Sequence, residues 1–161
     1  MGTLLIVHHS PTQTVRTLTD AVVAGARDDQ ITDVDVVVRH ALEATVDDVV
    51  AAHGIILGTP ANFGYMSGAL KHFFDTIFLE AGGALSDTGA ATTSVGGRKP
   101  YALYVHGRYD TTGAVRSVLT IVQALPWRPA ADVLDVVGDI TPGDRAAAYE
   151  LGGTIAALLS P

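Results

Sequence analysis

A chain of 161 residues is long enough for one domain, and folding can bury about 70% of the surface that the unfolded chain exposes. The sequence has no cysteine, which excludes a disulfide framework and a thiol nucleophile, and its formal net charge of −7 with scattered basic residues argues against a nucleic-acid partner. Its apolar runs are too short for a signal peptide or a membrane span, so we expect a cytoplasmic protein with no membrane partner.

Apolar runs and amphipathic stretches alternate along the first half of the chain. Residues 4–7, 33–38 and 54–57 are apolar or β-branched runs, which predict strands buried in a sheet. A helix with one apolar face separates the first two runs, and a helix over residues 45–52, with Thr45 as its cap, separates the second and third. The apolar face of the first helix consists of Val15, Leu18, Val22 and Ala26.

The second half of the chain repeats this alternation. Residues 101–105 and 132–137 predict two further strands, Ser67 is placed to cap one helix, and Thr141 begins a capping pattern for the last helix. Pro126 is expected to end the helix before the final strand, and residues 81–97, rich in Gly, Ala, Ser and Thr, predict a long flexible connection. The predicted buried stripes of the three helices are Leu70, Phe73, Phe74, Ile77 and Phe78; Val115, Val118, Leu119, Val122 and Leu125; and Leu151, Ile155 and Leu158.

Five strand-helix units in succession predict an α/β fold, in which a parallel sheet has helices on both faces. Of the two common doubly wound orders, one has six strands and usually a glycine-rich turn after the first strand. This chain has five predicted strands and a Ser-Pro-Thr-Gln-Thr turn there, so the order 2-1-3-4-5 is favoured. In that order ligands bind at the carboxyl ends of strands one and three.

The turn after the first strand has the composition of an anion site. The hydroxyls of Ser10, Thr12 and Thr14, with the backbone N–H groups of Gln13 and Val15, lie where a strand turns into a helix, so donors converge at the positive end of the helix dipole. A phosphate fits this arrangement, although Ser and Thr clusters also simply cap helices. The turn contains no lysine, which argues against a Walker-type triphosphate site.

Two later loops border the same crevice in the predicted sheet. Residues 59–65 contain Phe63 and Tyr65 among glycine, proline and asparagine, and residues 106–110 follow the fourth strand. A phosphate socket beside an aromatic slot suggests a phosphorylated planar ring, and flavin mononucleotide (FMN) satisfies both requirements. The alternative is that both aromatic side chains cover the core.

Other chemistries are less well supported by the sequence. His8 and His9 are adjacent and predicted to point to opposite faces of a strand, and the remaining histidines lack ligand spacing, so no metal site is expected. Ser67 lies one place late for a nucleophile elbow. A signalling receiver needs acidic residues after strands one and three, where this chain has His8-His9 and Gly58-Thr59.

Three segments resemble the flavin-binding loops of flavodoxin-like NAD(P)H-dependent FMN reductases and quinone reductases. Residues 59–75 resemble the family's flavin-contact loop and its following helix, residues 9–16 its phosphate loop, and residues 106–110 its third flavin loop. The resemblance implies a flavodoxin-like three-layer sandwich over residues 1–161, in which the first loop holds the ribityl phosphate and the other two clasp the isoalloxazine. The implied cofactor-binding residues are Ser10, Thr12, Gln13, Thr14, Val15, Thr59, Pro60, Ala61, Asn62, Phe63, Gly64, His106, Gly107 and Tyr109.

The chain departs from the family pattern at positions that affect affinity. Gln13 and Thr14 stand where Gly and Asn are common, and Val15 stands where Thr is frequent, which removes one hydroxyl ligand. Asn62 occupies a position that is aromatic in many members, so the stacking role passes to Phe63 or Tyr109. We therefore predict that FMN binds weakly.

The resemblance implies an FMN-dependent oxidoreductase that passes electrons from NAD(P)H to a quinone or similar small-molecule acceptor. The alternative is a flavodoxin-type electron carrier; Arg108 in the third loop favours the enzyme, since the carriers are more acidic around the flavin. The cofactor does the redox chemistry, so no side-chain acid or base is required. His106 or Tyr109 could protonate an acceptor, although a histidine after a strand is commonly a structural group. Relatives of this kind are often homodimers or homotetramers.

Overall fold

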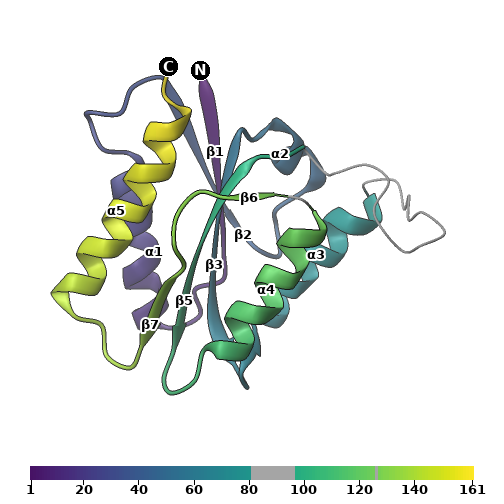
Figure 1. The fold of residues 1–161 in the computed structure, drawn as a ribbon, viewed down its shortest axis with the longest axis vertical. Helices are drawn as coiled ribbons and strands as arrows, with labels where there is room; N and C mark the ends of the chain where they lie inside the picture. Colours follow the sequence, from purple (N-terminus) through teal and green to yellow (C-terminus); the bar gives the residue numbers. More distant parts are fainter. Residues whose placement is uncertain (81–96, 126) are drawn as a thin grey trace.

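The computed structural model describes residues 1–80, 97–125 and 127–161, and its centre is a parallel sheet (Figure 1). Strand β1 runs over Gly2–His8, β2 over Val34–His40, β3 over Gly54–Asn62, β5 over Pro100–Gly107 and β7 over Leu134–Val137. Their spatial order is β2-β1-β3-β5, with β7 parallel to β5, which corresponds to the predicted order 2-1-3-4-5.

The prediction of five strands is wrong in detail, because the sheet formed by the described residues has seven. Strand β4, Tyr65–Met66, pairs antiparallel with the end of β3, and β6, Arg128–Pro129, pairs parallel with the start of β5. Both are two-residue strands, too short to give a period-2 pattern in a sequence. Strand β4 matters for function because it converts the predicted second loop into a hairpin.

Helices cover both faces of the sheet (Figure 1). Helix α1, Gln13–Ala26, and α5, Pro142–Leu159, pack on one face, and α2, Val46–Ala51, α3, Gly68–Glu80, and α4, Thr112–Ala124, pack on the other. Alternation along β1 divides its side chains between the two cores: Leu4 and Ile6 contact the α1 and α5 side, whereas Leu5 and Val7 contact the opposite side.

Hydroxyl residues fix three helix starts as predicted. Ser67 Oγ accepts a hydrogen bond from Leu70 N at 3.2 Å. Thr45 and Thr141 form capping boxes, in which each side chain pairs with the acid three residues later, Asp48 and Asp144. These contacts are local, which is why the sequence reveals them.

Two residues predicted in buried stripes are exposed. Phe78 is 38% and Leu158 is 57% exposed. Phe78 lies eight residues after Leu70, and at about 100° per residue it has rotated to the margin of the stripe. In α5 the buried face is centred on Ile155, so Leu159 packs against the core in place of Leu158.

Residues 81–96 and 126 lie outside the described residues, and so do all but the last residue of the predicted flexible connection and the predicted helix stop at Pro126. Within the described part of the chain, no helix combines the length and the apolar composition needed to cross a membrane.

Candidate functional site

Three turns meet at the carboxyl edge of the sheet, which is the lower edge in Figure 1. We call residues 9–12 together with the first turn of α1 loop 1, the turn at residues 63–64 with its flanking strand ends loop 2, and residues 108–111 loop 3. His9 N donates to Gly58 O at 3.0 Å and so joins loop 1 to β3. Pro60 pairs with His106, which joins the strand leading to loop 2 to the strand leading to loop 3.

Loop 2 packs closely against the end of β5 and the start of α4, at two glycines where a side chain would be crowded. A Cβ on Gly113, in the first turn of α4, would lie 2.0 Å from Gly64 O. A Cβ on Gly107 would lie 2.7 Å from Thr111 Cγ2 and 3.1 Å from Ala61 Cβ. The hairpin is therefore held against the start of α4 and the end of β5.

Loop 1 presents hydrogen-bond donors at the start of α1. Thr12 is the N-cap: its Oγ1 accepts from Val15 N at 3.3 Å and its carbonyl accepts from Arg16 N at 3.0 Å. The backbone N–H groups of Gln13 and Thr14 belong to the same first turn and have no intrahelical acceptor. Thr12 and Gln13 are exposed and Thr14 is half-buried, so an anion at this terminus can reach them.

Loop 2 combines a buried support with an exposed tip. Thr59 is fully buried; its hydroxyl accepts from Ser67 N at 3.0 Å and donates to Pro60 O at 2.8 Å, so it shapes the hairpin. Phe63 is fully exposed, with a φ of 51° in the left-handed region, and Gly64 follows with a φ of 73°. Strain at a non-glycine residue is unusual and is often found at functional sites.

In loop 3 the structure separates the two candidate proton donors. His106 is 8% exposed and its Nε2 donates to Gly138 O at 2.7 Å, so the ring ties β5 to the end of β7. This contact favours the structural role for His106. Tyr109 is 87% exposed and free to meet a ligand. Arg108 pairs with Asp139 at 2.8 Å, so its charge is compensated.

A cluster of histidines lies beside loop 1, which the sequence did not reveal. The rings of His8 and His9 lie 6.0 and 5.5 Å from the ring of His40, centroid to centroid. Strand β1 ends at His8, so the expected alternation does not apply to His9. The parallel pairing of His8 with His40 brings the rings together, and only the register of β1 and β2 could have predicted it.

Burial and mutual repulsion oppose protonation within this cluster. Burial lowers the pKa of His8; His40 and His9 lower it further, and Asp20 acts in the opposite direction. Burial and His40 lower the pKa of His9. Within the described residues, no group of three or more His, Cys, Asp or Glu side chains is arranged to hold a metal ion.

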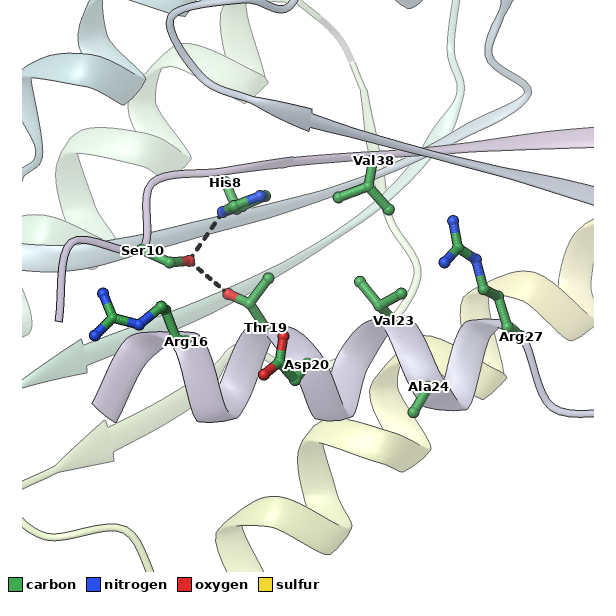
Figure 2. Close-up of a pocket in the computed structure, with 9 residues that line it drawn as sticks. All are labelled: His8, Ser10, Arg16, Thr19, Asp20, Val23, Ala24, Arg27 and Val38. Atoms are coloured by element: carbon green, nitrogen blue, oxygen red, sulfur yellow. Dashed lines mark hydrogen bonds between the residues drawn. The ribbon is translucent and has the colours of Figure 1, made fainter. Parts of the chain in front are cut away.

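A groove of about 540 Å³ lies between α1 and the β1-β2 edge of the sheet, behind loop 1 (Figure 2). Its walls include His8, Ser10, Thr19 and Asp20. Ser10 is the only predicted cofactor residue in the lining, so this groove is distinct from the surface formed by loops 2 and 3.

The three loops fit the parts of FMN. A phosphate needs several donors at one point, which the start of α1 supplies, and a planar ring needs flat apolar surface, which Phe63 and Tyr109 supply. His9 Nδ1, at the beginning of loop 1, is buried and has no hydrogen-bond partner among the described residues. A ligand oxygen or a water would satisfy that atom.

Sheet order and loop placement together define the flavodoxin-like class of α/β proteins, and solved structures agree. The chain matches a flavodoxin from the domain Archaea with a TM-score of 0.76 and 16% identity, covering 98% of both chains. It matches a flavodoxin-like WrbA-like protein from Agrobacterium tumefaciens with a TM-score of 0.71 and 16% identity, covering 99% of this chain and 98% of that one. An NADH:FMN oxidoreductase in its apo form gives a TM-score of 0.73 at 14% identity, covering 99% and 91%.

The chain belongs to the NADPH-dependent FMN reductase family, whose family model matches residues 13–129. The predicted family is thus confirmed, and its description names both FMN and NADPH. A stretch of 97 residues is also 32% identical to a flavodoxin of Aquifex aeolicus (strain VF5), covering 60% of this chain and 51% of the relative. The chain therefore spans about half the length of that flavodoxin.

Proposed function

We propose that this chain binds FMN across loops 1, 2 and 3 and uses NADPH to reduce a quinone, a free flavin or a similar small acceptor. The observation that carries the proposal is the packing of Gly64 on Gly113 and of Ala61 on Gly107. The proposal is further supported by the exposure of Phe63 and Tyr109, which follow strands whose carboxyl ends share an edge of the sheet with the carboxyl end of β1.

Loop 1 would hold the phosphate. The N–H groups of Gln13 and Thr14 and the hydroxyls of Thr12 and Thr14 are available as donors. Each hydrogen bond to a charged group contributes about 1.5–3 kcal/mol, compared with about 0.3–1 kcal/mol from the helix dipole, so the number of bonds decides affinity. Ser10 is the exception among the hydroxyls, because other side chains already engage it.

The remaining predicted residues divide by burial. Phe63, Asn62, Gly64 and Tyr109 are exposed and Ala61 is half-buried, so these would contact the ring. A second set is buried, and we assign to it the shaping of the loops and not side-chain contact: Val15, Thr59, Pro60, His106 and Gly107.

Bound FMN would supply hydride uptake from NADPH and electron transfer to the acceptor. The chain's own contribution is positioning and electrostatics: backbone N–H groups in loops 2 and 3 would stabilise negative charge on a planar ligand. Tyr109 is the exposed hydroxyl that could donate a proton to an acceptor, since His106 Nε2 is committed to Gly138 O.

A titration of the purified protein into FMN tests the site directly. We expect saturable quenching of flavin fluorescence, with a weak affinity that releases part of the flavin on desalting. Steady oxidation of NADPH in the presence of FMN and a quinone, without a partner protein, tests the activity, and NADH in the same assay tests the choice of donor. Absence of saturable quenching would refute the proposed function.

A flavodoxin-type carrier is the second candidate, and the 32% identical flavodoxin of Aquifex aeolicus favours it. The argument from Arg108 for the enzyme is weakened, because that side chain forms an ion pair with Asp139. Stable flavin binding without NADPH oxidation would favour the carrier. We also propose assembly into a homodimer or homotetramer that covers exposed aromatic residues at the site, which light scattering on the eluting protein measures.

A further inference from the structure

A chain of hydrogen bonds links the buried sheet to loop 1. Tyr104 Oη lies 2.7 Å from Thr19 Oγ1, Thr19 Oγ1 lies 2.7 Å from Ser10 Oγ, and Ser10 Oγ lies 2.9 Å from His8 Nδ1. Figure 2 shows the last two links, which run from α1 through loop 1 to β1. These hydrogen bonds therefore connect four side chains that are up to 96 positions apart in the sequence.

Tyr104, at the buried end of this series of hydrogen bonds, determines which hydroxyl donates and which accepts in each bond. Tyr104 is fully buried, and a Cβ on Gly58 would lie 2.0 Å from its ring, so the phenol is held in place. Burial raises the pKa of Tyr104, so the hydroxyl keeps its proton. Its one described partner is Thr19 Oγ1, so Tyr104 donates to Thr19; the Thr19 hydroxyl proton has no other acceptor among the described residues, so Thr19 donates to Ser10.

The proton on Ser10 then depends on His8. When His8 Nδ1 carries no hydrogen, it accepts the Ser10 hydroxyl proton, and Ser10 has none left for another acceptor. When Nδ1 carries a hydrogen, it donates to Ser10 Oγ. Ser10 Oγ then accepts two hydrogen bonds, and its own proton is released toward a third, tetrahedrally placed partner.

We propose that His8 is a positioning residue for the phosphate of FMN: when its Nδ1 is protonated, the Ser10 hydroxyl becomes a donor to a phosphate monoester held by loop 1. The inference rests on the proposed function. It also explains how Ser10, engaged by two side chains in the free protein, can still serve as the phosphate ligand that the sequence predicts. The gain of one hydrogen bond to a charged group corresponds to about a tenfold tighter Kd or more.

Charged and titratable groups around His8 set the pH at which this happens. His40 on β2 and His9 after β1 oppose protonation, and Asp20 on α1 favours it. Arg16 and Arg27 on α1 line the same groove. A bound phosphate would favour protonation, so ligand binding and proton uptake are coupled. His8 lines the open groove, which gives solvent a path to its ring.

The test is the pH dependence of FMN affinity between pH 8 and 5.5, measured by flavin fluorescence. The phosphate of FMN titrates near pH 6 itself, so the FMN affinity measured at each pH is divided by the affinity of His8→Asn at the same pH. The Asn side chain can still bond to Ser10 but does not titrate. We expect the wild-type protein to gain about tenfold in relative affinity at the lower pH. Ser10→Ala should lack that gain, and riboflavin, which has no phosphate, should show none with any variant.

His40→Asn is the matched control, because it removes a neighbouring charge but leaves the His8-Ser10 contact. It should keep the gain and move its midpoint to higher pH, since a repelling group is lost. A gain that survives in Ser10→Ala would overturn the inference, because charge alone would then explain it. A wild-type profile that coincides with His8→Asn would also overturn it.

A measurement on the wild-type protein keeps the inference testable if the variants do not fold. Imidazole nitrogen NMR at pH 7.5 should report Nδ1 of His8 as unprotonated in the free protein and protonated after FMN is added. An unchanged Nδ1 in a protein that binds FMN would overturn the inference alone. Failure of the wild-type protein to bind FMN at any pH would instead overturn the proposed function.

Discussion

Phe63 is a large apolar side chain that is fully exposed, and its backbone lies in the left-handed region. That region costs a non-glycine residue about 1–2 kcal/mol, whereas glycine adopts it freely but loses about 0.5–1 kcal/mol in entropy. Phe63→Gly should therefore raise the free energy of unfolding of the free protein by about 0.5–1 kcal/mol. It should weaken FMN binding about threefold to tenfold, because an aromatic contact contributes about 0.5–1.5 kcal/mol.

Asp33 provides a matched control for this prediction. It is the other non-glycine residue with positive φ among those described, at 59°, and it precedes β2 at the opposite edge of the sheet. Asp33→Gly should raise stability by a similar amount without changing FMN affinity. Urea unfolding and fluorescence titration measure the two effects, and unchanged FMN binding by Phe63→Gly would show that Phe63 does not contact the flavin.

Lys99 is buried at the start of β5, where its ammonium donates to the carbonyl oxygens of Val49 and Ala52 at the end of α2. Burial lowers the pKa of Lys99 to about 8, from an ordinary value of 10.5. Between these values the unfolded chain binds a proton that the folded chain has lost, so stability rises with pH in that window. From pH 8 to 9.5 the wild type should therefore gain up to about 1 kcal/mol in free energy of unfolding relative to Lys99→Met, after allowance for solvent screening.

The chain's other lysine, Lys71, is the control. It pairs with Asp75 at 2.6 Å on the exposed side of α3, and that hydrogen bond raises its pKa. The contribution of Lys71 to stability is therefore lost as pH rises. Relative to Lys71→Met, the wild type should gain no free energy of unfolding between pH 8 and 9.5. Parallel pH profiles for the two variants would contradict the assignment of a depressed pKa to Lys99.

At the scale of elements, helices α1 and α5 touch through glycine. A Cβ on Gly152 would lie 1.9 Å from Val22 O, and a Cβ on Gly25 would lie 1.8 Å from Tyr149 O. Gly152→Ala should therefore destabilise the protein by about 1–3 kcal/mol, because the helices must separate. Gly143→Ala, in the exposed first turn of α5, has its nearest atom at 3.6 Å and should stabilise by about 0.5–1 kcal/mol. Equal changes in urea midpoint for the two variants would contradict this account.

The elements that the sequence predicted well are those with local causes. The stripe of Leu70, Phe73, Phe74 and Ile77 and the caps at Thr45, Ser67 and Thr141 depend on neighbours within eight residues, and the structure contains all of them. Contacts between distant residues left no such signal. The fit of Tyr104 over Gly58, the glycines between α1 and α5, and the capping of α2 by Lys99 join segments that only the folded chain brings together.

The same distinction applies to the candidate site. Hydroxyl and glycine composition indicated which turns could bind a ligand, and the parallel order indicated that they share an edge. Composition could not show that Ser10 is engaged by His8 and Thr19, that the Thr59 hydroxyl is buried, or that His106 bonds to Gly138 O. These side chains are polar in sequence but form hydrogen bonds inside the protein, and partners contributed by other segments of the chain decide that.

For the whole molecule, the proposal requires one ligand to bridge turns that are about 50 residues apart along the chain. Ligand binding to the native state slows the exchange of those amide hydrogens that exchange only through global unfolding. At an FMN concentration a hundredfold above its Kd, the free energy of global unfolding rises by about 2.7 kcal/mol. Amides that exchange through local fraying slow only where the ligand touches them.

FMN should therefore protect amides of residues 13–14, 62–64 and 107–109 together, beyond any change at residues 28–32 on the opposite edge. Riboflavin, which lacks the phosphate, should protect residues 62–64 and 107–109 but leave residues 13–14 as in the free protein. Hydrogen exchange measured by mass spectrometry at matched saturation distinguishes the two ligands. Protection by FMN that is confined to residues 13–14 would mean that loop 1 binds phosphate without loops 2 and 3 holding the ring, because a ring held by both loops would close all three turns at once.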